Sequence, residues 1–441
     1  MSDMTVRIAP IPPLRGFALQ PVVLTVVVLF ITSLVTFHDL SFPLSLLNGS
    51  VSDEQQLAAQ AGEGSLLRRL FIPAVGLLGL HLLLRPHGRR AAVASPLGLV
   101  FVSYVGWAAL SLFWSTAPDL TLRRLTVFLI HLVGAIGVAT LAPRAMRSVF
   151  VWVTLANLAV GVLNELHLGT FAPFAAEYRF SGTVHPNLQG STAAQLALTG
   201  LCLCLPGDER RTRAGAALLI LGTATVFLTQ SRTSLICLVL AAAAVVAVWS
   251  WRRSARTFLV ALALCGLAGS ALTLAEAVAP DASPVAGVLA ALEKPRDEGN
   301  IGALTGRTDI WETCLAFAAE RPLTGAGFDS FWTPQRILEI SALHQWGINQ
   351  AHSMYVEHLI SLGIVGLALW CVLLLGGLVA GLRRYAAAPS GGTLWMLGQL
   401  GFYLFHGFNE SINIMPLFGG FALMMILAHL ALFRARRESA P

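Results

Sequence analysis

Uninterrupted apolar runs of about 20 residues recur along this 441-residue chain, and they constrain its fold more than any other feature. Apolar residues make up 56% of the sequence and charged residues 12%, against about 25% charged in soluble domains. A run of this length can cross a bilayer as a helix, whereas the strands of membrane barrels are about half as long and alternate in polarity. The sequence therefore predicts an all-α, polytopic membrane helical bundle.

Twelve transmembrane spans are predicted, separated mostly by short arginine-rich segments. Their centres lie near residues 27, 76, 105, 131, 158, 198, 221, 241, 266, 367, 402 and 424. Basic segments such as "RPHGRR" (85–90) fall in alternate loops, so the positive-inside rule predicts that both termini are cytoplasmic. The net charge of +6 then reflects topology, and no nucleic-acid partner is expected. No small-residue cleavage site follows the first run, so we expect it to remain as a span.

One long hydrophilic interruption divides the predicted spans into two groups. We expect nine spans in residues 1–275, a large outer loop in 276–350 and three spans in 351–441. Within that loop, "TDIWETCLAFAAE" (308–320) places apolar residues at helical spacing and predicts an amphipathic helix that ends before Pro322. A smaller outer loop is expected near 38–66. The sequence contains no visible internal repeat of the kind that marks many transporters.

Three arginines at the predicted outer edge are candidates for binding an anion, because a guanidinium beside hydrocarbon is costly unless it is paired or hydrated. Arg179 lies in the loop "EYRFSGTVHPNLQG", Arg232 lies where two spans meet with almost no loop, and Arg307 precedes the amphipathic helix. A helix N-terminus already favours anions, which suits a phosphate beside Arg307. Plainer interpretations stay open: Arg179 pairs with Glu177, Arg232 anchors a helix at the interface, and Arg307 is solvated.

His352 is the candidate general base, since histidine accepts a proton from a hydroxyl near neutral pH. It is predicted in the first turn of the tenth span, with Tyr355 one turn on as a weaker candidate for binding the acceptor sugar. Its plainer interpretation is a hydrogen-bonded structural histidine. Glu410, at the last outer turn, either binds sugar hydroxyls or pairs with an arginine. The remaining histidines near these sites are interpreted as structural: His185, His344, His358 and His406.

No paired carboxylates, metal-ligand spacing, glycine-rich phosphate loop or Ser-His-Asp order stands out in the sequence. The residues alone thus predict an outward-facing cavity with convergent arginines and one histidine. Such a cavity suits an anionic substrate such as a diphosphate, and a reaction that needs a base. Neither a metal nor another cofactor is expected.

Six motifs occur in the order found in the O-antigen ligase and polymerase superfamily, which the chain resembles over residues 95–433. They are "WSTAPDLTLRR", "RFSGTVHPNLQG", "TQSRTS", "GRTDIW", "RPLTGAGFDSFW" and "AHSMYVEHLISLGIVGL". Members transfer a glycan from undecaprenyl diphosphate to an acceptor hydroxyl on the periplasmic side of the bacterial inner membrane. The resemblance therefore implies a metal-independent, inverting glycosyltransferase with a fold like that of the GT-C membrane glycosyltransferases.

The resemblance also implies roles for individual residues. Arg232 and Arg307 would hold the diphosphate, Arg179 would assist, and His352 would activate the acceptor. Many relatives have asparagine at the position of Ser353, which leaves the role of that position open.

Members of this superfamily differ in the acceptor that they use. The segments "GAGFDSFW" and "NES" are most similar to exopolysaccharide polymerases, in which the acceptor is another lipid-linked repeat unit, and we favour that interpretation. Ligases instead transfer the glycan to lipid A-core. Membrane lipids and a chain-length regulator are further expected partners. A transporter of anions or lipid-linked substrates is the alternative from another class, and it would need the arginines near the midplane of the membrane.

Overall fold

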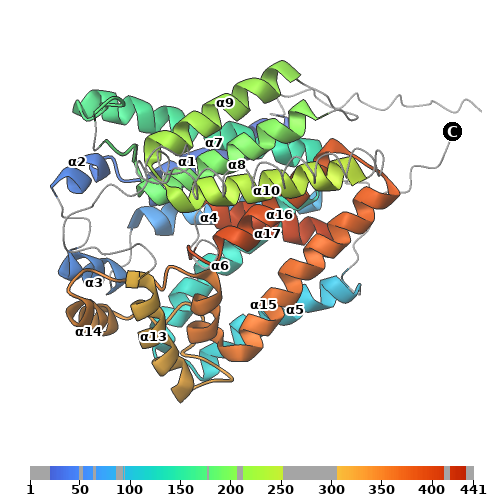
Figure 1. Ribbon diagram of the computed structural model, residues 1–441. Coiled ribbons are helices and arrows are strands. Elements are labelled where there is room, and N and C mark those ends of the chain that lie inside the picture. Colours follow the sequence, from blue (N-terminus) through green and yellow to red (C-terminus); the bar gives the residue numbers. More distant parts are fainter. Residues whose placement is uncertain are drawn as a thin grey trace, which may run out of the picture.

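The computed structural model describes residues 20–48, 53–62, 66–85, 93, 95–175, 178–205, 212–251, 305–411 and 418–433. Every regular element in these ranges is helical (Figure 1). The helices are α1 (Pro21–Phe37), α2 (Phe42–Leu47), α3 (Glu54–Gly62), α4 (Leu66–Leu84), α5 (Pro96–Leu110), the short 3-10 helix η2 (Ser111–Phe113), α6 (Pro118–Ala139), α7 (Pro143–Leu168), α8 (Pro186–Cys204), α9 (Thr212–Thr229), α10 (Arg232–Trp251), α13 (Thr305–Glu320), α14 (Pro334–His344), α15 (Met354–Ala387), α16 (Gly391–His406) and α17 (Phe418–Leu432).

The all-α polytopic fold predicted from hydropathy is confirmed. Eight helical segments in the described ranges are long and apolar enough to cross a membrane, namely 21–47, 66–84, 96–113, 118–139, 143–168, 212–229, 232–251 and 354–387. Helices α8, α16 and α17 lie at three further predicted centres, but α17 is shorter and the other two are less apolar. The span predicted near 266 lies outside the described residues. The count of twelve spans therefore stays a prediction.

Buried polar side chains explain why α8 and α16 are less apolar than the other spans. Gln399 on α16 donates to the backbone oxygen of Gln195 and to the hydroxyl of Thr199 on α8, both at 3.2 Å. Trp395 donates to the same hydroxyl at 3.1 Å. Because polar groups inside a membrane protein need partners, these contacts hold the two helices in one register.

Proline sets the start of many helices. Its missing N–H would be unpaired at the first helical position anyway, and its fixed φ already suits a helix. In the described chain, prolines occupy this position in α1, α5, α6, α7, α8 and α14: Pro21, Pro96, Pro118, Pro143, Pro186 and Pro334. These prolines thus set the residue at which each of these helices begins.

Two glycines allow α4 and α6 to approach closely. A Cβ on Gly79 would lie 2.3 Å from the backbone oxygen of Val133, and a Cβ on Gly137 would lie 2.4 Å from the backbone oxygen of Gly79. Small residues at helix contacts are the usual way for membrane helices to pair. This pairing brings together the N-terminal ends of α4 and α6, each of which carries two arginines.

The segments predicted as outer loops contain helices that pack on one another. Helices α3, α13 and α14 lie together at the lower left of the bundle in Figure 1, and α14 contacts α3 while α13 contacts α15. The predicted amphipathic helix is confirmed as α13, with Ile310 and Cys314 fully buried. It begins at Thr305, earlier than predicted, so Arg307 lies in its first turn and does not precede it.

A break at Gly363 docks this outer assembly onto α15. Gly363 has φ 67°, and a Cβ there would lie 2.3 Å from backbone atoms of the chain segment before Ala326. The backbone groups released by the break bond that segment instead: Ile364 donates to the oxygen of Pro322 at 2.8 Å, and Ala326 donates to the oxygen of Ile360 at 2.9 Å. The first part of the "RPLTGAGFDSFW" motif, residues 321–327, is therefore fixed against α15, the helix that follows His352.

Candidate active site

Glu410 lies at the centre of a buried network that joins four segments of the chain. Its Oε1 accepts a hydrogen bond from Arg307 Nη2 at 3.1 Å and another from Asn187 Nδ2 at 3.0 Å. Its Oε2 lies 3.7 Å from Nδ1 of His352. Arg307 also donates to Asn409 at 3.2 Å. Two of the predicted site residues, Arg307 and His352, thus share one carboxylate.

The carboxylate of Glu410 is held in its charged form. Burial raises the pKa of this group, but the nearby His352, His406 and Arg307 outweigh burial and lower the pKa to about 2. With 3% of its surface exposed, Glu410 has almost no area to offer a sugar. Of the two sequence interpretations, the structure therefore supports pairing with an arginine.

His352 does not lie in the first turn of α15, and that prediction is wrong. The helix begins at Met354, and His352 has a left-handed backbone with φ 49° two residues earlier. Ser353 is the N-cap, and its hydroxyl accepts from the backbone N–H of Val356. Asparagine caps helices as well as serine does, which explains why either residue suits position 353. The apolar run alone could not show that the helix starts after the histidine.

The ring of His352 presents only one nitrogen to a ligand. Nδ1 is buried, faces Glu410 and has no hydrogen-bond partner within 3.5 Å in the described part of the chain. The side chain is 19% exposed, and the Trp346 ring lies beside it at 6.2 Å between centroids. Because Nδ1 is buried, Nε2 is the nitrogen that can meet a hydroxyl.

Glu357 holds a neighbour of each member of this pair, a role that the sequence interpretation did not include. Its carboxylate accepts from the backbone N–H of Ala351 at 2.5 Å, from Trp332 Nε1 at 3.0 Å and from the hydroxyl of Ser411 at 3.3 Å. Ala351 precedes the histidine and Ser411 follows Glu410. One buried carboxylate thus sets the positions of both neighbours.

Arg179 joins the network through an amide. Its Nη2 donates to Asn187 Oδ1 at 3.2 Å, and its Nε donates to the backbone oxygen of Thr229 at 3.3 Å. Asn187 in turn donates to Glu410. The predicted alternative partner, Glu177, lies outside the described residues.

Arg232 lies at the same end of the bundle, at the first residue of α10. Only Gln230 and Ser231 separate α9 from α10, which confirms the predicted lack of a loop. Arg232 lies three residues after Thr229, whose backbone oxygen accepts the hydrogen bond from Arg179. Its side chain is partly buried and makes no hydrogen bond or ion pair with any residue that the structure describes. A guanidinium in that situation has its donors available for an anion.

Tyr355 and three of the four other histidines have structural contacts. The Tyr355 hydroxyl donates to the backbone oxygen of Leu404 at 2.9 Å, so it is already engaged away from the network. His185 caps α8, His344 contacts the hydroxyl of Thr313, and His358 contacts the hydroxyl of Tyr104. These histidines have the roles that the sequence interpretation gave them.

His406 differs from the other three histidines. It is fully buried, close to Glu410 and Arg307. Neither ring nitrogen has a hydrogen-bond partner among the described residues, and the ring stacks on Phe402 at 5.0 Å between centroids. The sequence analysis interpreted His406 as a structural histidine and did not include its proximity to Glu410.

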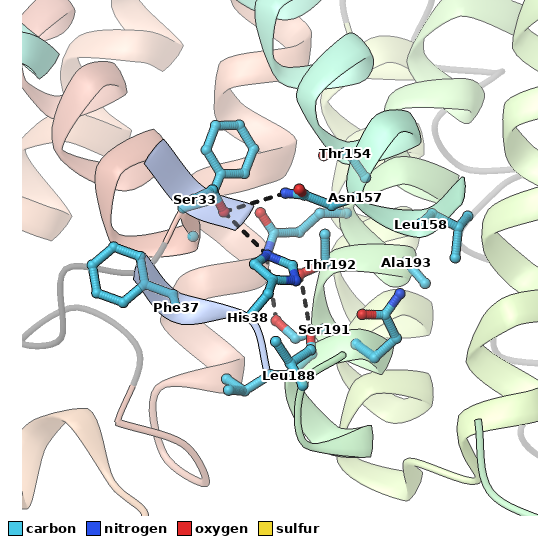
Figure 2. Close-up of a pocket in the computed structure, with 15 residues that line it drawn as sticks. Ser33, Phe37, His38, Thr154, Asn157, Leu158, Leu188, Ser191, Thr192 and Ala193 are labelled. Atoms are coloured by element: carbon cyan, nitrogen blue, oxygen red, sulfur yellow. Dashed lines mark hydrogen bonds between the residues drawn. The ribbon is translucent and has the colours of Figure 1, made fainter. Parts of the chain in front are cut away.

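A small polar pocket ties the Arg179 loop to α1. The Ser33 hydroxyl lies between His38 at 3.1 Å and Asn157 at 3.4 Å (Figure 2). The other nitrogen of His38 contacts the hydroxyl of Thr183 at 2.5 Å, four residues after Arg179. The pocket holds about 60 Å³, enough for water molecules but not for a sugar. Its role is to position the loop.

Within the described part of the chain, no three His, Cys, Asp or Glu side chains are grouped so that they could hold a metal ion. The charged groups around Glu410 are instead guanidinium and imidazole groups.

Fold and site together define a polytopic membrane protein with a buried Arg–Glu–His network at one end of its helical bundle. The O-antigen ligase family model matches residues 216–371, a range that contains Arg232, Arg307 and His352. The chain is also 26% identical over 355 residues to the exopolysaccharide production protein ExoQ of Rhizobium meliloti (strain 1021), covering 76% of this chain and 77% of that protein. Both matches support a similarity to the O-antigen ligase/polymerase-like superfamily, and they point to glycosyltransferase-like activity in polysaccharide biosynthesis.

Proposed function

We propose that this protein is a polysaccharide polymerase that transfers a glycan from a polyprenyl diphosphate to a sugar hydroxyl of a second lipid-linked glycan. The observation that carries the proposal is the shared carboxylate: Glu410 contacts His352 on one side and Arg307 on the other. A base and an anion-binding group are thereby held next to each other.

In this reaction the acceptor hydroxyl attacks the anomeric carbon of the donor glycan. Nε2 of His352 takes the hydroxyl proton as the new carbon–oxygen bond forms, and Glu410 stabilises the resulting imidazolium. The bond between the anomeric carbon and the phosphate oxygen breaks, and its electron pair leaves with the diphosphate. Direct displacement of this kind inverts the configuration at the anomeric carbon.

The arginines bind the leaving group. Diphosphate gains charge as the glycosidic bond breaks, and guanidinium groups placed beforehand stabilise that charge most strongly where water is excluded. Arg232 has its donors available, Arg307 lies in the first turn of a helix whose N-terminus also favours anions, and Arg179 supports both from the adjacent loop. Tyr355 is left out of this assignment because its hydroxyl is engaged.

Two alternatives differ from this proposal in substrate or in class. The matched family model is described as O-antigen ligase, which supports transfer to lipid A-core as the second candidate function. The name of the relative ExoQ, an exopolysaccharide production protein, supports the polymerase. Transport is disfavoured because Arg232 and Arg307 lie in the first turns of α10 and α13 and not in the middle of spans.

The proposal includes an orientation. In a bacterial inner membrane, the end of the bundle that holds α3, α13 and α14 would face the periplasm, with 276–350 as the large periplasmic loop between two groups of spans. The arginine-rich loops predicted on the cytoplasmic side support this orientation.

The test is a transfer assay with purified protein in proteoliposomes. The donor is the polyprenyl-diphosphate-linked repeat unit, supplied either alone or with lipid A-core. We expect glycan chains that lengthen with the donor alone. Transfer that requires lipid A-core would establish the ligase instead, and no glycosyl transfer in either case would contradict both enzyme functions.

A further inference from the structure

A second cluster of arginines lines a large cavity that none of the roles above uses. The cavity holds about 870 Å³, within the range of roughly 300–1,000 Å³ that ligand sites occupy. Helices α3, α4 and α6, the loop that holds Asp329 and the start of α15 form its walls. Four arginines line it: Arg68, Arg69, Arg123 and Arg124.

Four guanidinium groups line this cavity, against the two carboxylates of Asp329 and Glu357. Arg124 forms an ion pair with Asp329 at 3.4 Å. Arg123 donates to the backbone oxygens of Ala61 and Gly62, which carry no net charge. Arg69 makes no hydrogen bond or ion pair with any described residue. Like charges in one partly buried site repel each other, so an anion that enters gains from all of them.

The surroundings of the arginines indicate that this anion is part of a lipid. Leu66, Leu67 and Leu70 flank Arg68 and Arg69 on α4, with exposed fractions of 68%, 48% and 63%. Leucines this exposed at the end of a membrane span face hydrocarbon. A ligand that fits both features has a charged head and an apolar chain, as a lipid phosphate or diphosphate has.

The far wall of the cavity belongs to the candidate active site. Asn349, Glu357 and Ser411 line it, and Glu357 is the residue that holds the neighbours of His352 and Glu410. None of the donor arginines, Arg179, Arg232 and Arg307, is among the lining residues. A head group bound here would direct the glycan attached to it toward the residues that neighbour His352 and Glu410.

We propose that this cavity binds the phosphate-bearing head of the lipid acceptor, so that its sugar hydroxyl reaches His352. The inference rests on the proposed glycosyl transfer and names the site of its second substrate. Both candidate acceptors carry phosphate: a diphosphate in the lipid-linked repeat unit and sugar phosphates in lipid A-core.

The experiment measures KM separately for donor and acceptor in proteoliposomes made with neutral phospholipid. The variant is Arg69→Gln, because this side chain is exposed and holds no other described residue in place. The acceptors are the repeat unit on polyprenyl diphosphate, lipid A-core, and the repeat-unit glycan on an uncharged alkyl chain. We expect Arg69→Gln to raise the KM of a phosphate-bearing acceptor about tenfold and to leave the donor KM unchanged. The KM of the uncharged acceptor should not change.

Matched variants separate charge from structure. Arg69→Lys keeps the charge and should recover part of the affinity, while Arg383→Gln, at the other end of α15, should have no effect on either KM. An unchanged acceptor KM, or equal loss with the uncharged acceptor, would overturn the inference while the transferase remains. So would a defect that appears only when phosphatidylglycerol is added, since that would make the arginines anchors for bulk phospholipid. If wild-type protein transfers no glycan, the proposed function itself fails.

Discussion

The carboxylate of Glu410 lies 3.7 Å from Nδ1 of His352, although one reaches the site after α16 and the other before α15. The same carboxylate holds Arg307 at 3.1 Å. This arrangement places a negative charge behind the imidazole ring. Such a charge stabilises the imidazolium that forms when the other ring nitrogen accepts a proton from a hydroxyl.

Replacing Glu410 by glutamine should lower kcat by about 100-fold or more, because the amide keeps the shape but cannot stabilise an imidazolium. Initial rates of transfer in proteoliposomes at saturating substrate measure this. Glu410→Asp retains the charge and should lose less. Equal kcat in Glu410→Gln and wild type would remove the carboxylate from the reaction.

Replacing Arg232 by alanine should raise the donor KM roughly 10- to 100-fold, because a hydrogen bond to a charged group usually contributes that much to binding. The fold should survive, since Arg232 holds no described residue. Steady-state kinetics with varied donor check this, with Arg383→Ala as a control on the far side of the membrane. A donor KM at the wild-type value would leave Arg232 as an anchor at the membrane interface.

Replacing Gly363 by alanine should lower stability by more than about 1–3 kcal/mol, because the left-handed backbone is strained for alanine and the Cβ meets backbone 2.3 Å away. The loss should appear as a lower thermal unfolding temperature in detergent. Gly106→Ala is the matched control, since a Cβ at Gly106 has no neighbour within 4 Å. Similar unfolding temperatures for the two variants would contradict the docking role of the break in α15.

Asp329 should give the protein a stability that falls as pH rises. Burial raises the pKa of its carboxyl from 3.8 to about 6, although Arg124 acts in the opposite direction. Between these values the folded chain binds the proton more tightly than the unfolded chain, so this group favours the folded state most below pH 4 and loses that effect by about pH 6.

The pH effect is measured as the difference in unfolding temperature between pH 4.5 and pH 7. Asp329→Asn removes the titrating group. Its unfolding temperature at pH 7 minus that at pH 4.5 should therefore be more positive than the same difference in wild type. Asp309→Asn, at an exposed position on α13, should leave it as in wild type. The same result for both variants would show that Asp329 does not titrate in this way.

Hydropathy predicted most of the bundle because it acts through a local rule: each apolar run marks a span. The structure adds that Pro118 and Pro143 start two of these helices. The break at Gly363 was not predicted, since the run "HLISLGIVGLALW" is apolar on both sides of it. The helix can break there because the backbone N–H of Ile364 donates to the carbonyl of Pro322, which belongs to another motif.

The site was predictable in its residue types and not in its connections. Arg307 was singled out because a charge beside hydrocarbon needs a reason, and His352 because histidine accepts a proton near neutral pH. Asn187 links Arg179 to Glu410, and Glu357 holds Ala351 and Ser411 beside the pair, so both residues join separate parts of the chain. No local pattern marks such contacts.

The most direct test of the central claim separates donor binding from chemistry in His352→Ala. Binding of the polyprenyl-diphosphate-linked glycan is measured by isothermal titration, and transfer is measured in a single turnover with enzyme in excess. We expect a donor Kd equal to that of wild type and no product, since the arginines remain and the base is gone. Product formed by His352→Ala at the wild-type rate would contradict it.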